Sequence, residues 1–268
     1  YFLNKWEGGF KQVFTEEMLE ESKYIGLDGL IQSHDNIHPV IVDLVEGKKE
    51  VKSRLMPINT VYRLDDWAPV SALSSLGDFY DTNWSVGIGF DRGDPMKAEY
   101  TSARSIFTII AKGLPGSKSN PFAFLNQGAK LKYLYIVLAV EIMEKNTLDE
   151  MKGLITKGIY QYKGIDSVCS ERWGMWDLAQ WCESQGIPFE DISPTYERQK
   201  AAFSELFNIY KEGMIKYPEV PIAGSKQIDI LREELSAFDH NIDKKWFGSL
   251  EKDEKRGIQD DAVYAQGW

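Results

Sequence analysis

The chain has 268 residues, of which 43% are hydrophobic and 27% charged, and this composition is typical of a globular protein with an apolar core in one domain or two. The net charge of −10 argues against binding nucleic acid through overall charge, but it is compatible with a local basic patch or with bound metal ions. Two cysteines cannot form a disulfide framework.

No apolar run approaches the roughly 18–20 residues that a membrane span needs, and no signal peptide is recognisable. Because the chain begins at Tyr1 rather than at an initiator Met, we expect a fragment or a processed chain of a cytoplasmic protein.

The first 83 residues have an irregular pattern. A short helix is predicted over residues 15–23, with Thr15 as its N-cap. Strand-like pieces follow at residues 39–45 and 60–64, with a turn signal at residues 46–49.

The composition changes after Asn83, where longer strand-like runs begin. Residues 84–91, 105–113 and 133–143 predict a meander of three antiparallel strands. Helix and strand patterns then alternate. The predicted helices are 147–162, 175–183, 196–217 and 227–238, and the predicted strands are 166–172 and 189–192. A meander followed by such alternation indicates a mixed α/β fold.

The first candidate functional residue is Asp91, at the end of the strand 84–91. Alternate residues of a strand share a face, so Asp91 lies on the same face as Ser85, Gly87 and Gly89. This face carries no bulky side chain. Glycines in a strand often mark the close approach of a ligand or of another backbone. The sequence leaves open whether a phosphate and metal ion or a packed helix occupies this face.

A second acid, Glu171, ends the strand 166–172 and shares its face with Ser167 and Cys169. The alternative interpretation is an ion pair with Arg172. Asp166 falls on the opposite face and is a weaker candidate.

Asp260 and Asp261 open a predicted C-terminal helix. Carboxylates are favoured in a first helical turn, so N-capping is the simpler interpretation. Asp261, however, shares the helical spacing of Ile258, Ala262 and Ala265 and therefore leans toward the packed face.

Carboxylates brought together from distant segments can hold two Mg²⁺ or Mn²⁺ ions, since these ions prefer oxygen ligands. Two such ions supply what phosphodiester hydrolysis needs, namely a nucleophilic water, an in-line geometry and relief of charge on the leaving oxygen.

Four short motifs, in this order and spacing, resemble the C-terminal nuclease domain of the large terminase subunit of tailed bacteriophages. They are residues 87–91 (Gly-Ile-Gly-Phe-Asp), 169–174 (Cys-Ser-Glu-Arg-Trp-Gly), 192–194 (Ile-Ser-Pro) ahead of a helix that carries Lys200, and 260–265 (Asp-Asp-Ala-Val-Tyr-Ala). The resemblance covers residues 84–268 well and residues 1–83 loosely.

The resemblance implies a ribonuclease H-like fold for residues 84–268, with a mixed sheet whose first three strands are antiparallel and the rest parallel, flanked by helices on both faces. It implies that residues 1–83 are a connecting segment that follows a missing ATPase domain. It also implies that Asp91, Glu171 and one or both of Asp260 and Asp261 bind two Mg²⁺ or Mn²⁺ ions. The implied substrate is double-stranded DNA, cut during genome packaging in the infected bacterial cell. The implied partners are the ATPase region of the full-length protein, the small terminase subunit and the capsid portal. No membrane is expected as a partner.

One departure limits this interpretation, because the chain has no P-loop and therefore cannot itself be the packaging ATPase. Two alternatives stay open. One is a non-catalytic assembly or docking module, in which the acids are N-caps and ion pairs. The other is a different ribonuclease H-like enzyme, such as a resolvase, a transposase or ribonuclease H.

Other residues leave two interpretations each. Lysines around the meander can follow a DNA backbone or lie on a solvated face; they are Lys97, Lys112, Lys118, Lys130 and Lys132. Trp173 and Trp176 can wall a site, although packing in the core is the simpler expectation. His240 can act as a general base or lie in a loop at a helix end.

Overall fold

The computed structural model describes residues 11–24, 43–45, 48–50, 80–93, 105–115, 133–143, 145–171, 174–218, 230–249 and 259–268. The strand predicted at residues 60–64, Trp173, and the lysines at 97, 118, 130 and 132 lie outside these ranges.

A seven-stranded mixed sheet in the order β2-β10-β7-β6-β5-β8-β9 forms the centre of the molecule. Its strands are β2 (Lys23–Tyr24), β5 (Tyr80–Asp91), β6 (Ile106–Pro115), β7 (Leu134–Ile142), β8 (Ser167–Glu171), β9 (Phe189–Ile192) and β10 (Ile215–Pro218). The strands β5, β6 and β7 are antiparallel, whereas β8 and β9 continue in parallel beside β5, and β10 and β2 in parallel beside β7. The predicted fold class is confirmed by this pairing.

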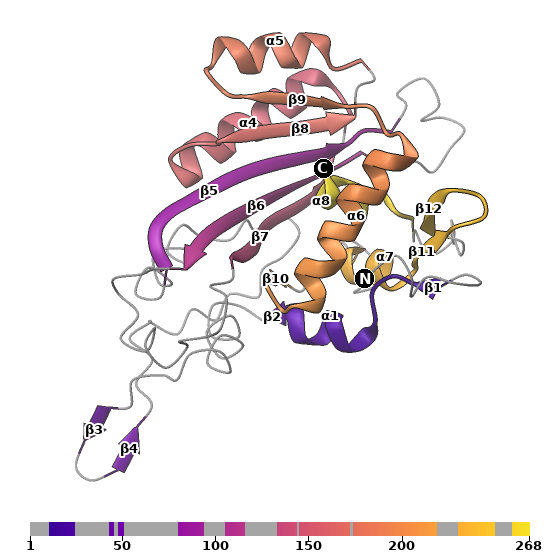
Figure 1. Cartoon of the computed structure of the whole chain (residues 1–268). Coiled ribbons are helices and arrows are strands. Elements are labelled where there is room, and N and C mark those ends of the chain that lie inside the picture. Colours follow the sequence, from indigo (N-terminus) through magenta and orange to yellow (C-terminus); the bar gives the residue numbers. More distant parts are fainter. Residues whose placement is uncertain are drawn as a thin grey trace.

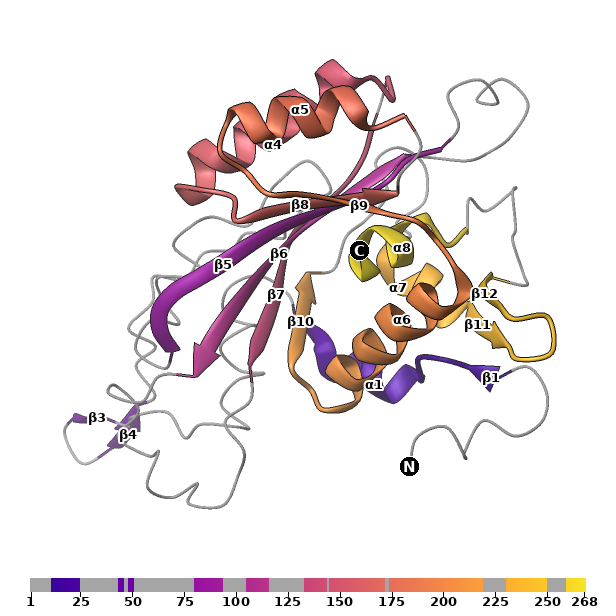
Figure 2. The same cartoon turned by 45° about the horizontal axis from the view of Figure 1, so that its top comes forward.

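Helices cover both faces of the sheet (Figure 1). On one face lie α4 (Leu148–Tyr162) and α5 (Trp176–Ser184); on the other lie α6 (Tyr196–Lys211), α7 (Ile230–Ser236) and α8 (Asp261–Gly267). Figure 2 shows α8 close to the sheet, with the chain's C-terminus beside it. Each face has its own cluster of buried apolar side chains. Among the described helices, none combines the length and the apolar character needed to cross a bilayer.

Smaller sheets complete the described part of the chain. The strands β1 (Lys11–Gln12), β11 (Phe238–Asn241) and β12 (Trp246–Ser249) form an antiparallel sheet in the order β1-β11-β12. The strands β3 (Asp43–Val45) and β4 (Lys48–Glu50) pair antiparallel, so Lys48 and Lys49 of the predicted turn signal lie in a strand.

Threonine caps fix where three helices begin. The hydroxyl oxygens of Thr147 and Thr195 accept hydrogen bonds from the backbone N–H groups of Glu150 and Arg198, at 3.2 and 3.4 Å. The hydroxyl of Thr15 accepts one from the N–H of Met18 at 3.4 Å, and α1 (Glu16–Ser22) begins there as predicted.

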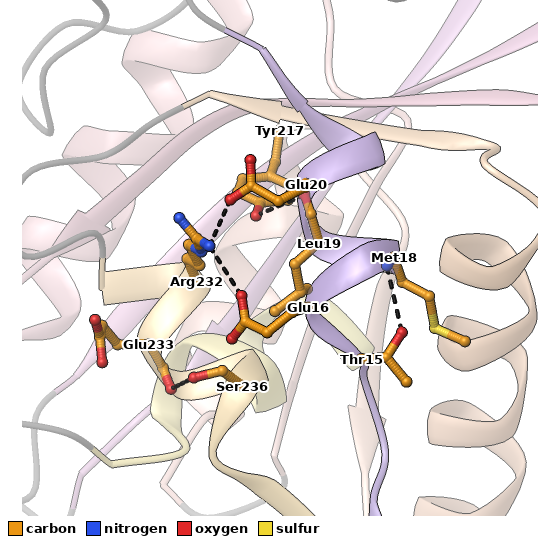
Figure 3. Close-up of polar contacts among 9 residues, drawn as sticks. All are labelled: Thr15, Glu16, Met18, Leu19, Glu20, Tyr217, Arg232, Glu233 and Ser236. Atoms are coloured by element: carbon orange, nitrogen blue, oxygen red, sulfur yellow. Dashed lines mark hydrogen bonds and ion pairs between the residues drawn. The ribbon is translucent and has the colours of Figure 1, made fainter.

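The segment 11–24 packs against elements from the C-terminal part of the chain. Strand β1 pairs with β11, and β2 pairs with β10. Arg232 of α7 forms ion pairs with Glu16, at 2.8 Å, and with Glu20, both on α1 (Figure 3). The division of the chain at residue 83 stays a prediction, but this early segment is built into the body that carries the large sheet.

Two predicted helices end earlier than expected. The helix predicted over residues 196–217 stops at Lys211, since Gly213 takes a φ of 65° and the N–H of Met214 turns back to the carbonyl of Ile209 at 2.9 Å. The chain then enters β10. The helix predicted over residues 227–238 ends at Ser236, and Phe238 begins β11 instead.

Candidate functional site

The two faces of β5 meet different surroundings. Val86, Ile88 and Phe90 are buried in the apolar cluster shared with α4 and α5. Gly89 faces the opposite way, where a Cβ would collide with the carbonyl oxygen of Ala265 in α8. Of the two interpretations of this small-residue face, a packed helix therefore accounts for Gly89.

The same contact sets the position of Asp91. Strand β8 pairs in parallel with β5, with Gly89 opposite Cys169 and Phe90 opposite Ser170. The next residues along the two strands are Asp91 and Glu171, which therefore lie side by side on the face that α8 covers. Asp91 lies deep among protein atoms but keeps a partly exposed surface.

Helix α8 packs on β5 and β6 and brings in the last two candidate acids. Asp261 is its first residue, and Asp260 occupies the N-cap position without a side-chain capping hydrogen bond. Instead, a carboxylate oxygen of Asp260 accepts a hydrogen bond from the backbone N–H of Ser249 in β12, at 3.2 Å. Both aspartates are buried, with 7% and 8% of their surface exposed. The expectation that Asp260 simply caps the helix is therefore wrong as far as its own side chain is concerned.

Electrostatics shows that the predicted acids are brought together. The pKa of Asp91 is raised well above its ordinary value, chiefly because burial disfavours the charged form. In the described part of the chain, the charged neighbours that raise it further are all carboxylates. In order of effect they are Asp261, Glu171, Asp260 and Glu234.

The end of α8 also borders Glu171. Burial raises the pKa of Glu171, while the indole of Trp268 lowers it by less. The indole N–H approaches the carboxylate without reaching hydrogen-bonding geometry. The hydroxyl of Tyr264 donates a hydrogen bond to the carbonyl of Phe247 at 3.1 Å. Burial, and after it the charges of the nearby acids, raise the pKa of Tyr264 well above its ordinary value. Tyr264 therefore stays protonated beside the carboxylates.

The sequence interpretation missed Glu234 of α7. Its side chain is completely buried, and a carboxylate oxygen accepts a hydrogen bond from the backbone N–H of Ala262 at 2.7 Å. A signal for it exists in the sequence, because Glu234 shares the helical spacing of Ile230, Leu231 and Leu235, all of which are buried. An acid on an apolar helix face is rarely without a specific partner.

Asp166 has a structural role. A carboxylate oxygen of Asp166 accepts a hydrogen bond from the backbone N–H of Val86 at 2.7 Å, just before β8 begins. The bond ties the start of β8 to β5.

His240 lies in strand β11 rather than in a loop. Its ring stacks on Phe247 with centroids 4.0 Å apart, and Nε2 lies 3.0 Å from the hydroxyl oxygen of Tyr196. Burial and the charge of Lys200 lower the pKa of His240, which favours the neutral ring.

Trp176 does not pack in the core, since it is 71% exposed at the start of α5. The expectation of core packing is wrong, and the residue borders a surface hollow between α5 and β9 rather than the carboxylates.

Lys112, the one meander lysine within the described ranges, is exposed on β6, with its ammonium 4.4 Å from the centre of the Tyr133 ring. In β6, Ile106 lies opposite Asp91, so Lys112 lies about 20 Å from that point along the strand at ~3.4 Å per residue. It therefore does not flank the carboxylates.

The chemistry of the donor set fits hard divalent cations. Asp91, Glu171, Asp260 and Asp261 offer only oxygen donors, which Mg²⁺ and Mn²⁺ prefer, and mutual repulsion among these acids is relieved by a cation. Within the described ranges, no group of three or more acidic, histidine or cysteine side chains is close enough together to mark a metal site by itself.

No protein-family model matches the chain, and no curated protein matches its sequence. Among solved structures, the chain is similar to the large terminase nuclease from thermophilic phage G20c with bound magnesium, at 16% identity and a TM-score of 0.45, over 70% of this chain and 82% of that chain. The large terminase nuclease domain of Thermus phage P74-26 gives 15% identity and a TM-score of 0.44, over 70% and 80% of the two chains. The HK97 bacteriophage large terminase has 11% identity and a TM-score of 0.40, over 74% of this chain and 41% of that chain. All three are large terminases or large terminase nucleases, the family that the resemblance of the sequence motifs names.

Proposed function

We propose that the chain is a metal-dependent endonuclease that cuts double-stranded DNA during viral genome packaging. The observation that carries the proposal is the meeting of Asp91 with Glu171, Asp260 and Asp261, which come from two strands and a helix far apart in the sequence. A concentration of buried negative charge destabilises a fold unless something binds there, so its presence favours a functional site.

Asp91 lies beside Glu171 and close to Asp261 and Asp260, so it is the central acid of the group. Asp91, Glu171 and one or both of Asp260 and Asp261 would hold the metal ions. When bound, two Mg²⁺ or Mn²⁺ ions supply a water activated for attack and neutralise the charge that develops on the phosphate.

The protein residues around the acids exclude part of the surrounding water. The α8 backbone covers Gly89, and the protonated Tyr264 and Trp268 border the acids on the same helix. Water exclusion strengthens the attraction between carboxylates and cations, because the local dielectric constant is lower than in water.

The substrate and partners follow from the motifs. Their resemblance to large terminase nuclease domains supports double-stranded DNA as substrate, and it supports the ATPase region, the small terminase subunit and the capsid portal as partners. Because the net charge of the chain is −10, we propose that these partners contribute much of the affinity for DNA.

Plasmid cleavage tests the proposal. Supercoiled plasmid should be nicked or linearised with Mg²⁺ or Mn²⁺, remain intact with EDTA, and still be cut when only zinc is chelated. Cleavage at full rate in EDTA would rule out the metal mechanism. Intact plasmid with every divalent ion tested, by a folded protein that binds no Mn²⁺ in calorimetry, would favour the non-catalytic assembly module instead.

A further inference from the structure

The first turn of α8, which carries Asp260 and Asp261, is held by a residue outside that helix. A carboxylate oxygen of Glu234 in α7 accepts the hydrogen bond of the Ala262 N–H at 2.7 Å. Residues at the start of a helix have backbone N–H groups without partners inside the helix, and a side chain normally satisfies them from the N-cap position. Here the N-cap residue Asp260 makes no such bond, and Glu234 satisfies the N–H of Ala262 from another helix.

The support beneath Glu234 is rigid. Ile230, Leu231 and Leu235 on the same helix are buried in the apolar cluster that also contains Ala262, Val263 and Ala265 of α8. A short helix whose apolar face is fully packed cannot shift without opening that cluster. The carboxylate of Glu234 therefore occupies a fixed point from which it can fix the first turn of α8.

The charge of Glu234 is costly at this place. It is fully buried, and it is among the acids that raise the pKa of Asp91. A purely structural cap would be served better by Ser, Thr or Asn, which satisfy an N–H without adding charge. The reach of the side chain explains why a shorter residue does not serve here, since Glu234 spans the gap between two helices that packing keeps apart.

We propose that Glu234 is a positioning residue, which sets the direction of the Asp260 and Asp261 side chains through its hydrogen bond to the Ala262 N–H. The inference rests on the proposed function, because it assigns to these two aspartates the binding of divalent cations. Glu234 acts through the backbone of α8 and is not itself a ligand in this assignment.

Three substitutions separate the hydrogen bond from the charge. Glu234→Gln keeps an acceptor oxygen at the same reach and removes the charge. Glu234→Asp keeps the charge but falls short by one methylene, and Glu234→Ala removes both. If this hydrogen bond positions α8, Glu234→Gln should behave like the wild type. Glu234→Asp and Glu234→Ala should both lose the positioning of the first turn of α8. Glu233→Gln, the same change one residue earlier on α7, is the matched control.

Two readouts do not depend on nuclease activity. In metal-free protein, amide hydrogen exchange at Ala262 should be about tenfold faster or more in the Asp and Ala variants, and near the wild-type rate in Gln. Mn²⁺ affinity measured by calorimetry should fall about 10–100-fold in the Asp and Ala variants, and by less than about threefold in the Gln and Glu233→Gln variants.

The outcomes distinguish this inference from the proposed function. If Glu234→Gln weakens Mn²⁺ binding as much as Glu234→Ala while Ala262 stays protected, the charge acts directly and the positioning role is wrong. If all Glu234 variants match the wild type in exchange and affinity, the role is also wrong, but the nuclease proposal stands. If the wild type binds no Mn²⁺ and cuts no DNA, the nuclease proposal fails, and the exchange data alone report on the contact between α7 and α8. Should Glu234→Ala not fold, Gln and Asp still give opposite predictions.

Discussion

The two faces of strand β5 use neighbouring residues for different purposes. On the face toward α4 and α5, Val86, Ile88 and Phe90 contribute only apolar burial. On the face toward α8, Gly89 admits a helix backbone and Asp91 meets other carboxylates. Burial stabilises one face, whereas the other combines close packing with unfavourable charge. Substitutions on the two faces should therefore separate stability from activity.

The largest effect should come from Asp91. Asp91→Asn should abolish Mn²⁺-dependent plasmid cleavage, because the central carboxylate is lost. In EDTA the same variant should be as stable as the wild type or more so, since the repulsion among the acids is reduced. Cleavage rates and thermal unfolding in EDTA check both halves. A clearly lower melting temperature for the variant in EDTA would indicate a stabilising ion pair instead.

The two aspartates of α8 should differ from each other. Asp261 raises the pKa of Asp91 more than Asp260 does, and Asp260 is engaged by the N–H of Ser249. We expect Asp261→Asn to lower the cleavage rate at saturating Mn²⁺ by about 10²-fold or more, and Asp260→Asn to lower it by less. Near-wild-type rates for both would show that these acids serve only the helix end.

Gly89 and its neighbour Ile88 test the two faces directly. Gly89→Ala should displace α8 and cost about 1–3 kcal/mol of unfolding free energy, as overpacking does, and it should also slow cleavage per folded molecule. Ile88→Val, on the opposite face, should cost about 0.5–1.5 kcal/mol and leave cleavage per folded molecule unchanged. Urea unfolding and cleavage by the folded fraction measure the difference. Equal losses of activity in both variants would contradict the separation of the faces.

The smallest effect concerns pH. An unfolded Asp titrates near ~3.9, and Asp91 has a raised pKa in the fold, so the folded state binds more protons between the two values. Stability without metal therefore falls as the pH rises through that interval. Relative to Asp91→Asn, the wild type should gain melting temperature as the pH is lowered from about 7 toward the ordinary pKa of Asp, ~3.9. A difference that stays constant, or a relative loss on acidification, would argue against this repulsion.

The sequence predicts the sheet well because its strands carry local patterns. The meander and the alternation after it indicate the order of strand directions, and residue parity alone puts Asp91 and Glu171 on small-residue faces. These inferences work because side-chain alternation is a property of each strand by itself.

The remaining features depend on contacts between distant elements. Strand β10 overlaps the end of the helix predicted over residues 196–217. The residue types continue a helical pattern beyond Gly213, although the chain turns at that glycine. The helical spacing of Glu234 places it on the apolar face of α7, but no local pattern shows that its partner is the N–H of Ala262 in another helix. Whether Gly89 admits a ligand or a helix is likewise decided only by the position of Ala265.

Helix α7 has a consequence for how the chain tolerates insertions. Arg232 reaches the acids of α1, and Glu234 reaches α8. Residues two apart on a helix point about 200° apart, so the two contacts lie on nearly opposite sides of α7 and fix its rotation about its own axis. A substitution at either position removes a contact but keeps that rotation. One residue inserted between them would turn the rest of α7 by about 100° and carry Glu234 away from Ala262. Insertions between positions 232 and 234 should therefore be tolerated poorly.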